Sequence, residues 1–250
     1  MSSQRRVSLV LGAVAALLLL WMVNPWIAVP DGIRQLVTVA FWASSIALVI
    51  VLYLDARRDP SAEEVEVEGP AFARFLFNNS RAGLFWLPIR LFVGFEWLEA
   101  GWHKVSGPGW LDGGSALAGF WTKAAAQGEG GKGPITYEWY RDFINFLLAG
   151  HHETWFAPLI AFGELAVGVG LILGALTGVA AFFGAFMNMS FLLAGSASSN
   201  PIMFTFAVGL MLAWKVAGYY GVDRYLLPIL GTPWRPGSTA ARSAEPAMRR

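Results

Sequence analysis

The chain has 250 residues, of which 56% are hydrophobic and 14% are charged, and its mean hydropathy is +0.51. This composition excludes an ordinary soluble domain and predicts an all-α integral membrane protein. The formal net charge of +1 gives no basis for binding nucleic acid, and the absence of cysteine excludes disulfides, a CxxC redox pair and c-type haem attachment.

The amino-terminal part contains two apolar runs, Val7 to Val23 and Leu36 to Leu54, separated by a turn with two prolines. Each is long enough to cross a hydrocarbon core of about 30 Å, which takes roughly 17 to 25 helical residues. The first run fits either a cleaved signal peptide or a retained helix. No small-residue cleavage site follows it, because an Asn-Pro-Trp sequence comes next, so we favour two N-terminal transmembrane helices over residues 1–54.

Residues 55–83 form the first polar stretch, with several arginines and four glutamates between Glu63 and Glu68. We interpret this stretch as a cytoplasmic linker that contains a short interfacial helix from Phe72 to Phe77. It separates the two N-terminal helices from the rest of the chain.

Further apolar runs follow, and they bring the predicted number of transmembrane helices to six. They are Leu84 to Trp102, Trp155 to Leu176, Gly178 to Gly195 and Pro201 to Tyr219. We assign residues 84–228 to a four-helix membrane domain and residues 229–250 to a tail. Most of the 18 Lys and Arg residues lie at the amino end, in the linker and from Lys215 onward, which predicts that both termini are cytoplasmic.

The longest segment outside the predicted spans is the loop at residues 103–154, which we place on the outer face. Its portions Ser115 to Ala126 and Tyr137 to Leu148 have helical apolar spacing, and the glycine-rich run from Gly128 to Pro134 separates them. We expect two helices over the outer mouth of the bundle. A loop of this length usually covers a site or docks a partner.

Three strongly polar residues, Arg90, Glu164 and Asn188, fall inside predicted spans, where each is a functional hypothesis by default. At about 1.5 Å per residue, their depths bring all three within reach near the middle of the membrane. One reading is an Arg90–Glu164 ion pair, with Asn188 supplying hydrogen bonds, that holds the bundle in register. In the other, compatible reading the group is the polar end of an aromatic pocket that binds a quinone head group.

The helix that begins at Leu84 carries two polar stripes on opposite sides, at about 100° per residue. One stripe holds Arg90, Gly94, Trp97, Gly101 and Lys104, and the other holds Glu96, Glu99 and His103. We take Glu96, His103 and Glu164 as candidate catalytic residues that move protons. The candidate quinone- or ligand-binding residues are Arg90, Trp97, Glu164 and Asn188.

A histidine pair, His151 and His152, precedes Glu153 at the end of the outer loop. Adjacent histidines point in different directions on a helix, and the H-x-x-x-H spacing of helical metal sites is missing. We therefore predict interfacial histidines and no metal site. A three-histidine site would need His103 to fold back over them, which the sequence leaves open.

Residues Leu84 to Pro228 contain stretches that resemble the DoxX/DoxD family, whose DoxD members are the large membrane subunit of thiosulfate:quinone oxidoreductase. The matching stretches are RLFVGFEWLEAGWHKVSGPGWLDGG (Arg90 to Gly114), GELAVGVGLILGALTG (Gly163 to Gly178), FMNMSFLLAGSASSNP (Phe186 to Pro201) and AGYYGVDRYLLP (Ala217 to Pro228). The resemblance implies a four-helix core in a prokaryotic cell membrane. It also implies oxidation of two thiosulfates to tetrathionate, quinone as the acceptor, and a small partner subunit.

Our leading hypothesis is therefore a membrane subunit of a quinone-linked oxidoreductase that acts on a small anionic sulfur compound, which lysines in the outer loop would attract. The alternative is a non-catalytic membrane module that assembles with or stabilises a larger complex. A small-molecule transporter ranks third, because neither an inverted repeat nor a pair of proline-broken helices is visible.

Overall fold

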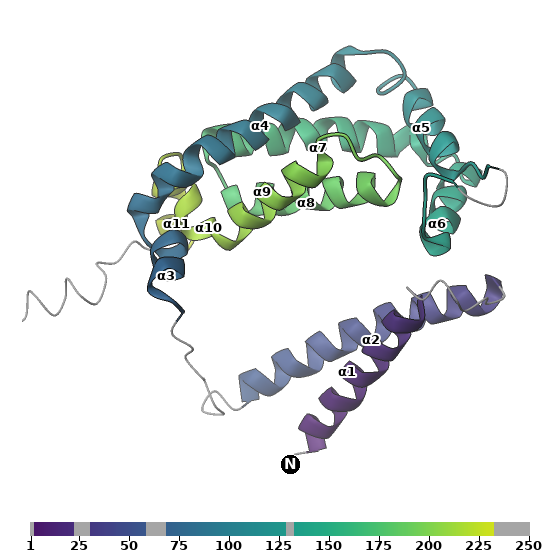
Figure 1. Ribbon diagram of the computed structural model, residues 1–250, viewed down its shortest axis with the longest axis horizontal. Coiled ribbons are helices and arrows are strands. Elements are labelled where there is room, and N and C mark those ends of the chain that lie inside the picture. The colour runs from purple at the N-terminus through teal and green to yellow at the C-terminus, as the bar shows by residue number, and fades with distance from the viewer. Residues whose placement is uncertain (1–2, 23–30, 59–68, 129–132, 233–250) are drawn as a thin grey trace, which may run out of the picture. The chain divides into compact units, whose positions relative to one another are not determined.

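The computed structural model describes residues 3–22, 31–58, 69–128 and 133–232, and within these ranges the regular structure is helical, with no strand (Figure 1). The chain forms two compact units, which are taken separately. The first comprises residues 1–68 with 135–146, and the second comprises residues 69–134 with 147–250.

In the first unit, helix α1 (Ser3–Met22) packs against helix α2 (Asp31–Arg58). The contact is close, since a Cβ at Gly12 would lie 3.7 Å from Leu48 Cδ2. Both helices lie where apolar runs predicted them, although Val23, the last residue of the first run, and the following turn residues 24–30 lie outside the described residues. The first nine residues of α6 (Glu138–Ala149) also belong to this unit, where Arg141 Nη2 donates to the Ile135 carbonyl at 2.7 Å.

The second unit contains the predicted four-helix arrangement, in which the four longest helices lie side by side (Figure 1). These helices are α4 (Gly83–Ser106), α7 (Glu153–Leu173), α8 (Thr177–Leu193) and α9 (Asn200–Leu212). Shorter elements complete the unit: α3 (Ala71–Asn78), a 3-10 turn (Ser80–Ala82), α5 (Ser115–Ala125), α10 (Trp214–Ala217) and α11 (Asp223–Ile229). The short helix predicted at Phe72 to Phe77 is thus present as α3.

Among the described residues, two helical segments rather than the predicted six are long and apolar enough to cross a membrane, namely Gln35–Leu52 and Glu153–Leu173. Helix α4 has the length, with 24 residues, but carries Arg90, Glu96 and Glu99 along it. Helices α8 and α9 have 17 and 13 residues, which at about 1.5 Å per residue is roughly 26 and 20 Å. Charge and early helix ends therefore reduce the predicted number.

Small residues let α4 and α7 approach each other closely. A Cβ at Gly168 would lie 2.5 Å from the Leu98 backbone nitrogen, and one at Gly101 would lie 2.6 Å from the Leu165 nitrogen. Such contacts with backbone atoms leave no room for a side chain. The antiparallel register of the two helices is therefore fixed along most of their length.

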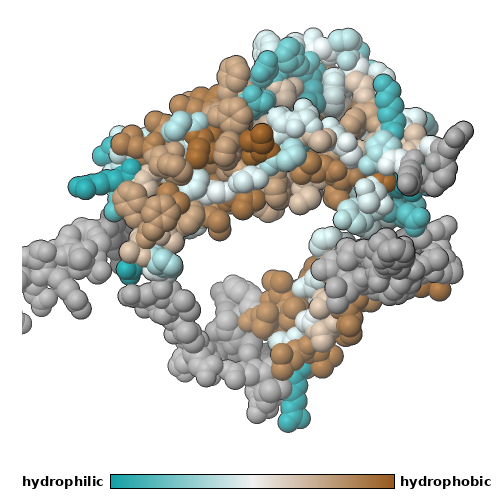
Figure 2. Space-filling model, viewed as in Figure 1, coloured by the Kyte–Doolittle hydropathy of each residue, from teal (hydrophilic) through white to brown (hydrophobic). Residues whose placement is uncertain are grey.

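The interior of the bundle holds large side chains from α4 and α7, including Trp86, Val93, Trp97 and Leu171. The exterior is also apolar, since Leu159, Phe162 and Phe186 are all more than half exposed. Figure 2 shows hydrophobic side chains over the visible face of this bundle. An apolar exterior around a packed core is what a bundle in contact with lipid requires.

The outer loop folds into helices where its apolar spacing predicted them, as α5 and α6. Within the second unit, α5 packs against the ends of two bundle helices. The Phe120 ring lies 6.0 Å from that of Phe191 on α8, and the Trp121 ring lies 5.6 Å from that of Phe156 on α7. Helix α5 therefore covers one end of the four-helix arrangement.

Candidate functional site

The buried acid Glu164 forms an ion pair with Lys104. Helix α4 continues to Ser106, so Lys104 is still helical, and its Nζ lies 2.7 Å from Glu164 Oε2. The Glu164 side chain is 1% exposed and that of Lys104 is 18% exposed. The Lys104 ammonium also lies 5.0 Å from the centroid of the Trp110 ring, in the turn that follows α4. The pair therefore joins a fully buried carboxylate to a group that solvent reaches.

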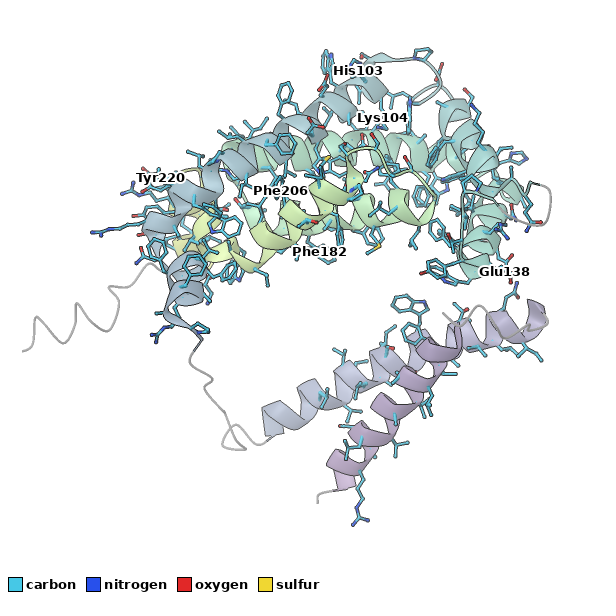
Figure 3. The ribbon with its side chains drawn as sticks, in the orientation of Figure 1. His103, Lys104, Glu138, Phe182, Phe206 and Tyr220 are labelled. Carbon is cyan, nitrogen blue, oxygen red and sulfur yellow. The ribbon has the colours of Figure 1, made fainter. Side chains whose placement is uncertain are left out.

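The predicted ion pair between Arg90 and Glu164 is wrong. Arg90 donates from Nη2 to the Tyr220 carbonyl at 3.1 Å and from Nη1 to the Ala217 carbonyl at 3.4 Å. Figure 3 shows Tyr220 and Lys104 at opposite ends of the bundle. The estimated depths in the membrane made this pairing plausible. However, the Arg90 side chain extends toward the start of α4, whereas Glu164 pairs with Lys104, which lies about four turns after Arg90 on α4.

Arg90 belongs instead to an anchor at the turn between α7 and α8. Its charge interacts with Asp223, whose carboxylate accepts backbone N–H groups from Leu176 at 2.6 Å and Thr177 at 2.8 Å. We call Arg90 and Asp223 the inner anchor. Carboxylate bonds to the first N–H groups of a helix stabilise it strongly, so the inner anchor fixes the start of α8.

Asn188 lies in the core with no protein partner for its side chain in the part of the chain that the structure describes. It is 0% exposed, and both its amide nitrogen and its amide oxygen lack a hydrogen bond. The residues that precede Glu164 and Asn188 in sequence lie next to each other, since a Cβ at Gly163 on α7 would lie 3.9 Å from Met187 Sδ on α8. The antiparallel helices α7 and α8 therefore place Glu164 and Asn188 at the same height.

The indole N–H of Trp97 is a further hydrogen-bond donor, about one helical turn from the level of Asn188. A Cβ at Gly184, one turn before Asn188, would lie 2.9 Å from Trp97 Nε1, and this indole N–H is buried without an acceptor among the described residues. Glu164 Oε1 likewise has no donor there. We call Trp97, Lys104, Glu164 and Asn188 the Glu164 cluster.

The Glu164 cluster offers several hydrogen-bonding atoms that the protein itself does not use. Lys104 and Trp97 donate, Asn188 both donates and accepts, and Glu164 accepts when ionised and donates when protonated. A buried polar atom without a partner costs about 1–3 kcal/mol. A polar ligand or water that met these atoms would recover that cost, so the cluster suits the binding of a polar group.

The remaining predicted catalytic residues, Glu96 and His103, lie on the other face of α4. Glu96 is half-buried, and His103 is 75% exposed with its Nε2 3.8 Å from Glu99 Oε1. The structure therefore brings Trp97, Glu164 and Asn188 together, adds Lys104, and leaves Glu96, His103 and Arg90 apart from them.

The histidines that close the outer loop have partners of their own. His151 Nδ1 lies 3.3 Å from Glu153 Oε1, and His152 Nδ1 accepts from Trp155 Nε1 at 3.2 Å. Within the described ranges, no group of three His, Cys, Asp or Glu side chains is placed to hold a metal ion.

Sequence reasoning missed Lys104 as the partner of Glu164 and gave Asp223 no role. The sequence did indicate Lys104, because helical periodicity placed it on the same stripe as Arg90, Trp97 and Gly101. The signal for Asp223 was an acidic residue directly after an apolar run, in a stretch already noted for its resemblance.

Comparison with known families gives a match to the DoxX family model over residues 85–195. Residues 85–195 are therefore similar to a DoxX domain. No curated protein and no solved structure matches the chain. The matched stretch contains the whole Glu164 cluster, whereas Asp223 of the inner anchor lies beyond it. The DoxX match and the two long apolar helices together indicate a membrane protein.

Proposed function

We propose that the chain is the membrane subunit of a quinone-linked oxidoreductase and that the Glu164 cluster binds the reacting head group. The observation that carries the proposal is the fully buried Asn188, whose amide atoms both lack a protein partner beside the Lys104–Glu164 pair. Orphaned polar atoms at the junction of three helices are a feature of ligand sites in membrane bundles.

The cluster has the groups that quinone reduction needs. Lys104, Trp97 and Asn188 are donors for a quinone carbonyl oxygen. A quinone takes up two electrons and two protons to become a quinol, and the Lys104–Glu164 pair connects the buried end of the site to the surface that supplies protons. His103 and Glu99 lie at the same end of α4, where their exposed pair would exchange protons with solvent.

The electrons would come from a small sulfur anion such as thiosulfate, two of which release two electrons on forming tetrathionate. Exposed bases of the outer segment, such as Lys123, would attract this anion. The chain has no cysteine, so any thiol chemistry on the sulfur requires another polypeptide. We therefore include a small partner subunit in the proposal.

We further propose that α4, α8 and α9 cross the cell membrane together with α7, α1 and α2, with both termini in the cytoplasm. On α4, Arg90 is 2% exposed and its guanidinium lies within the inner anchor, so its charge would not face lipid. Single cysteines at Ser2 and Ser243 test the topology in a chain that has none of its own. Labelling of either by an impermeant reagent added to intact cells would contradict it.

A second function, a non-catalytic module that assembles a larger complex, is favoured by the same ion pair. The Lys104–Glu164 contact ties α4 to α7 and would be needed for a stable bundle even without catalysis.

Thiosulfate-dependent reduction of a short-chain quinone by the purified protein, with and without copurifying chains, separates the two functions. We expect turnover that falls at least tenfold in Glu164→Gln, while Ser190→Ala, a change at a partly exposed residue of α8, retains it. Absence of turnover in the wild type, together with failure of the Glu164→Gln protein to assemble with its partner, would favour the non-catalytic module.

A further inference from the structure

A cavity lies at the amino-terminal end of α8, where α8, α10 and α11 meet in the second unit. Its volume is about 510 Å³, within the range of small-molecule sites. Thr177, at this end of α8, precedes Asn188 by 11 residues, or about 16 Å along the helix, so the cavity is separate from the Glu164 cluster. Among the side chains that line it are Leu176, Val179, Phe182, Trp214, Leu227 and Leu230.

The residues that line this cavity differ in exposure between its deep end and its opening. Thr177 and Asp223 also line it and are 0% exposed, so they form its floor. Phe182, Val179 and Leu230 are more than half exposed and form its mouth. Figure 3 places Phe182 on the outer surface of the bundle, which we take to face lipid. The cavity therefore leads from an apolar opening to a polar floor.

The floor has hydrogen-bonding capacity that the protein leaves unused. Thr177 Oγ1 is buried with no partner among the described residues. Each carboxylate oxygen of Asp223 accepts one backbone N–H and retains a further lone pair. The two side chains converge, because a Cβ at Gly218 would contact Asp223 Oδ2 and lie 2.6 Å from Thr177 Oγ1.

This chemistry restricts the ligand. Asp223 offers a head group only acceptor atoms, so it accepts a hydrogen bond from a hydroxyl and cannot donate one to an anionic head group. The Thr177 hydroxyl can donate to the oxygen of the ligand's hydroxyl. We propose that the cavity binds an amphiphile with an uncharged hydroxyl head and a hydrocarbon tail, with the head on Thr177 and Asp223 and the tail leaving past Phe182. A membrane quinol and a lipid alcohol such as a monoacylglycerol share this chemistry. The site does not depend on the proposed oxidoreductase activity.

The test uses a long-chain alcohol that carries a photoreactive diazirine, added to the full chain in nanodiscs, with labelled peptides identified by mass spectrometry. We expect labelling on α8 and α11 that 1-decanol suppresses and decanoate does not. A comparison of how strongly a short-chain quinol and a monoacylglycerol each suppress the labelling then shows whether the ligand is a quinol or a lipid alcohol.

Two variants make the result specific. Thr177→Val keeps the shape and removes only an unpartnered hydroxyl, so it should fold and bind the alcohol roughly two- to tenfold more weakly, the worth of one hydrogen bond. Val179→Trp should block the mouth, whereas Phe186→Trp, an exposed change on the same helix outside the cavity, should not. Equal labelling of both tryptophan variants, undiminished labelling of Thr177→Val, or competition by decanoate as strong as by decanol would overturn the proposal.

Discussion

Replacing Lys104 by methionine tests the central feature of the Glu164 cluster. The change keeps the length of the side chain but removes the ammonium that lies 2.7 Å from a carboxylate with 1% exposure. Loss of one partner from a buried pair costs about 3–5 kcal/mol, because the other charge remains buried and unpaired. Since Lys104 is 18% exposed and solvent screens part of the interaction, we expect a loss below this range, about 2–3 kcal/mol.

The double variant Lys104→Met with Glu164→Leu supplies the internal control. It removes both charges, and apolar replacement of a buried pair is often neutral or stabilising, so it should recover most of the loss. Unfolding of the nanodisc-reconstituted or micellar protein, followed by tryptophan fluorescence, gives the four corners of a double-mutant cycle. Lys123→Met, at an exposed lysine on α5, should change stability by less than about 0.5 kcal/mol.

The reasoning fails if Lys104→Met costs no more than about 1 kcal/mol, the worth of an exposed ion pair. It also fails if the double variant is less stable than either single variant, because the stabilising effects of Lys104 and Glu164 would then not be coupled.

Three further predictions concern packing, the inner anchor and the site. Gly168→Ala should destabilise the bundle by about 1–3 kcal/mol, because the new Cβ would meet the backbone of α4; Gly119→Ala, on α5 with open space around it, should be neutral or stabilising in the same unfolding assay. Asp223→Asn should lower stability by about 1.5–3 kcal/mol through weaker bonds to the first N–H groups of α8, and an unchanged unfolding midpoint would remove the anchor from the argument. Asn188→Leu should leave stability equal or higher, because it removes unpartnered polar atoms from the core, yet abolish quinone reduction; a loss of stability with full turnover would reverse the assignment.

Much of the fold was predictable because the signals are local. The apolar runs gave the positions of α1, α2, α4, α7 and α8, and helical spacing in the outer loop predicted α5 and α6. Phase along α4 placed Arg90, Gly94, Trp97 and Gly101 on one face, and all four are buried. Helical periodicity depends only on neighbours in sequence, so a single chain carries this information.

The sequence by itself therefore determined that this is a helical membrane protein and which residues of α4 share a face. Only the tertiary structure decided that Glu164 pairs with Lys104 and that Arg90 joins Asp223. Those pairings depend on where α4 ends and on the register that Gly101 and Gly168 impose between antiparallel helices. Our predicted span ended at Trp102, one turn too early, and a one-turn error changes which charges can meet. Contacts between residues far apart in sequence are set by packing, which no local pattern contains.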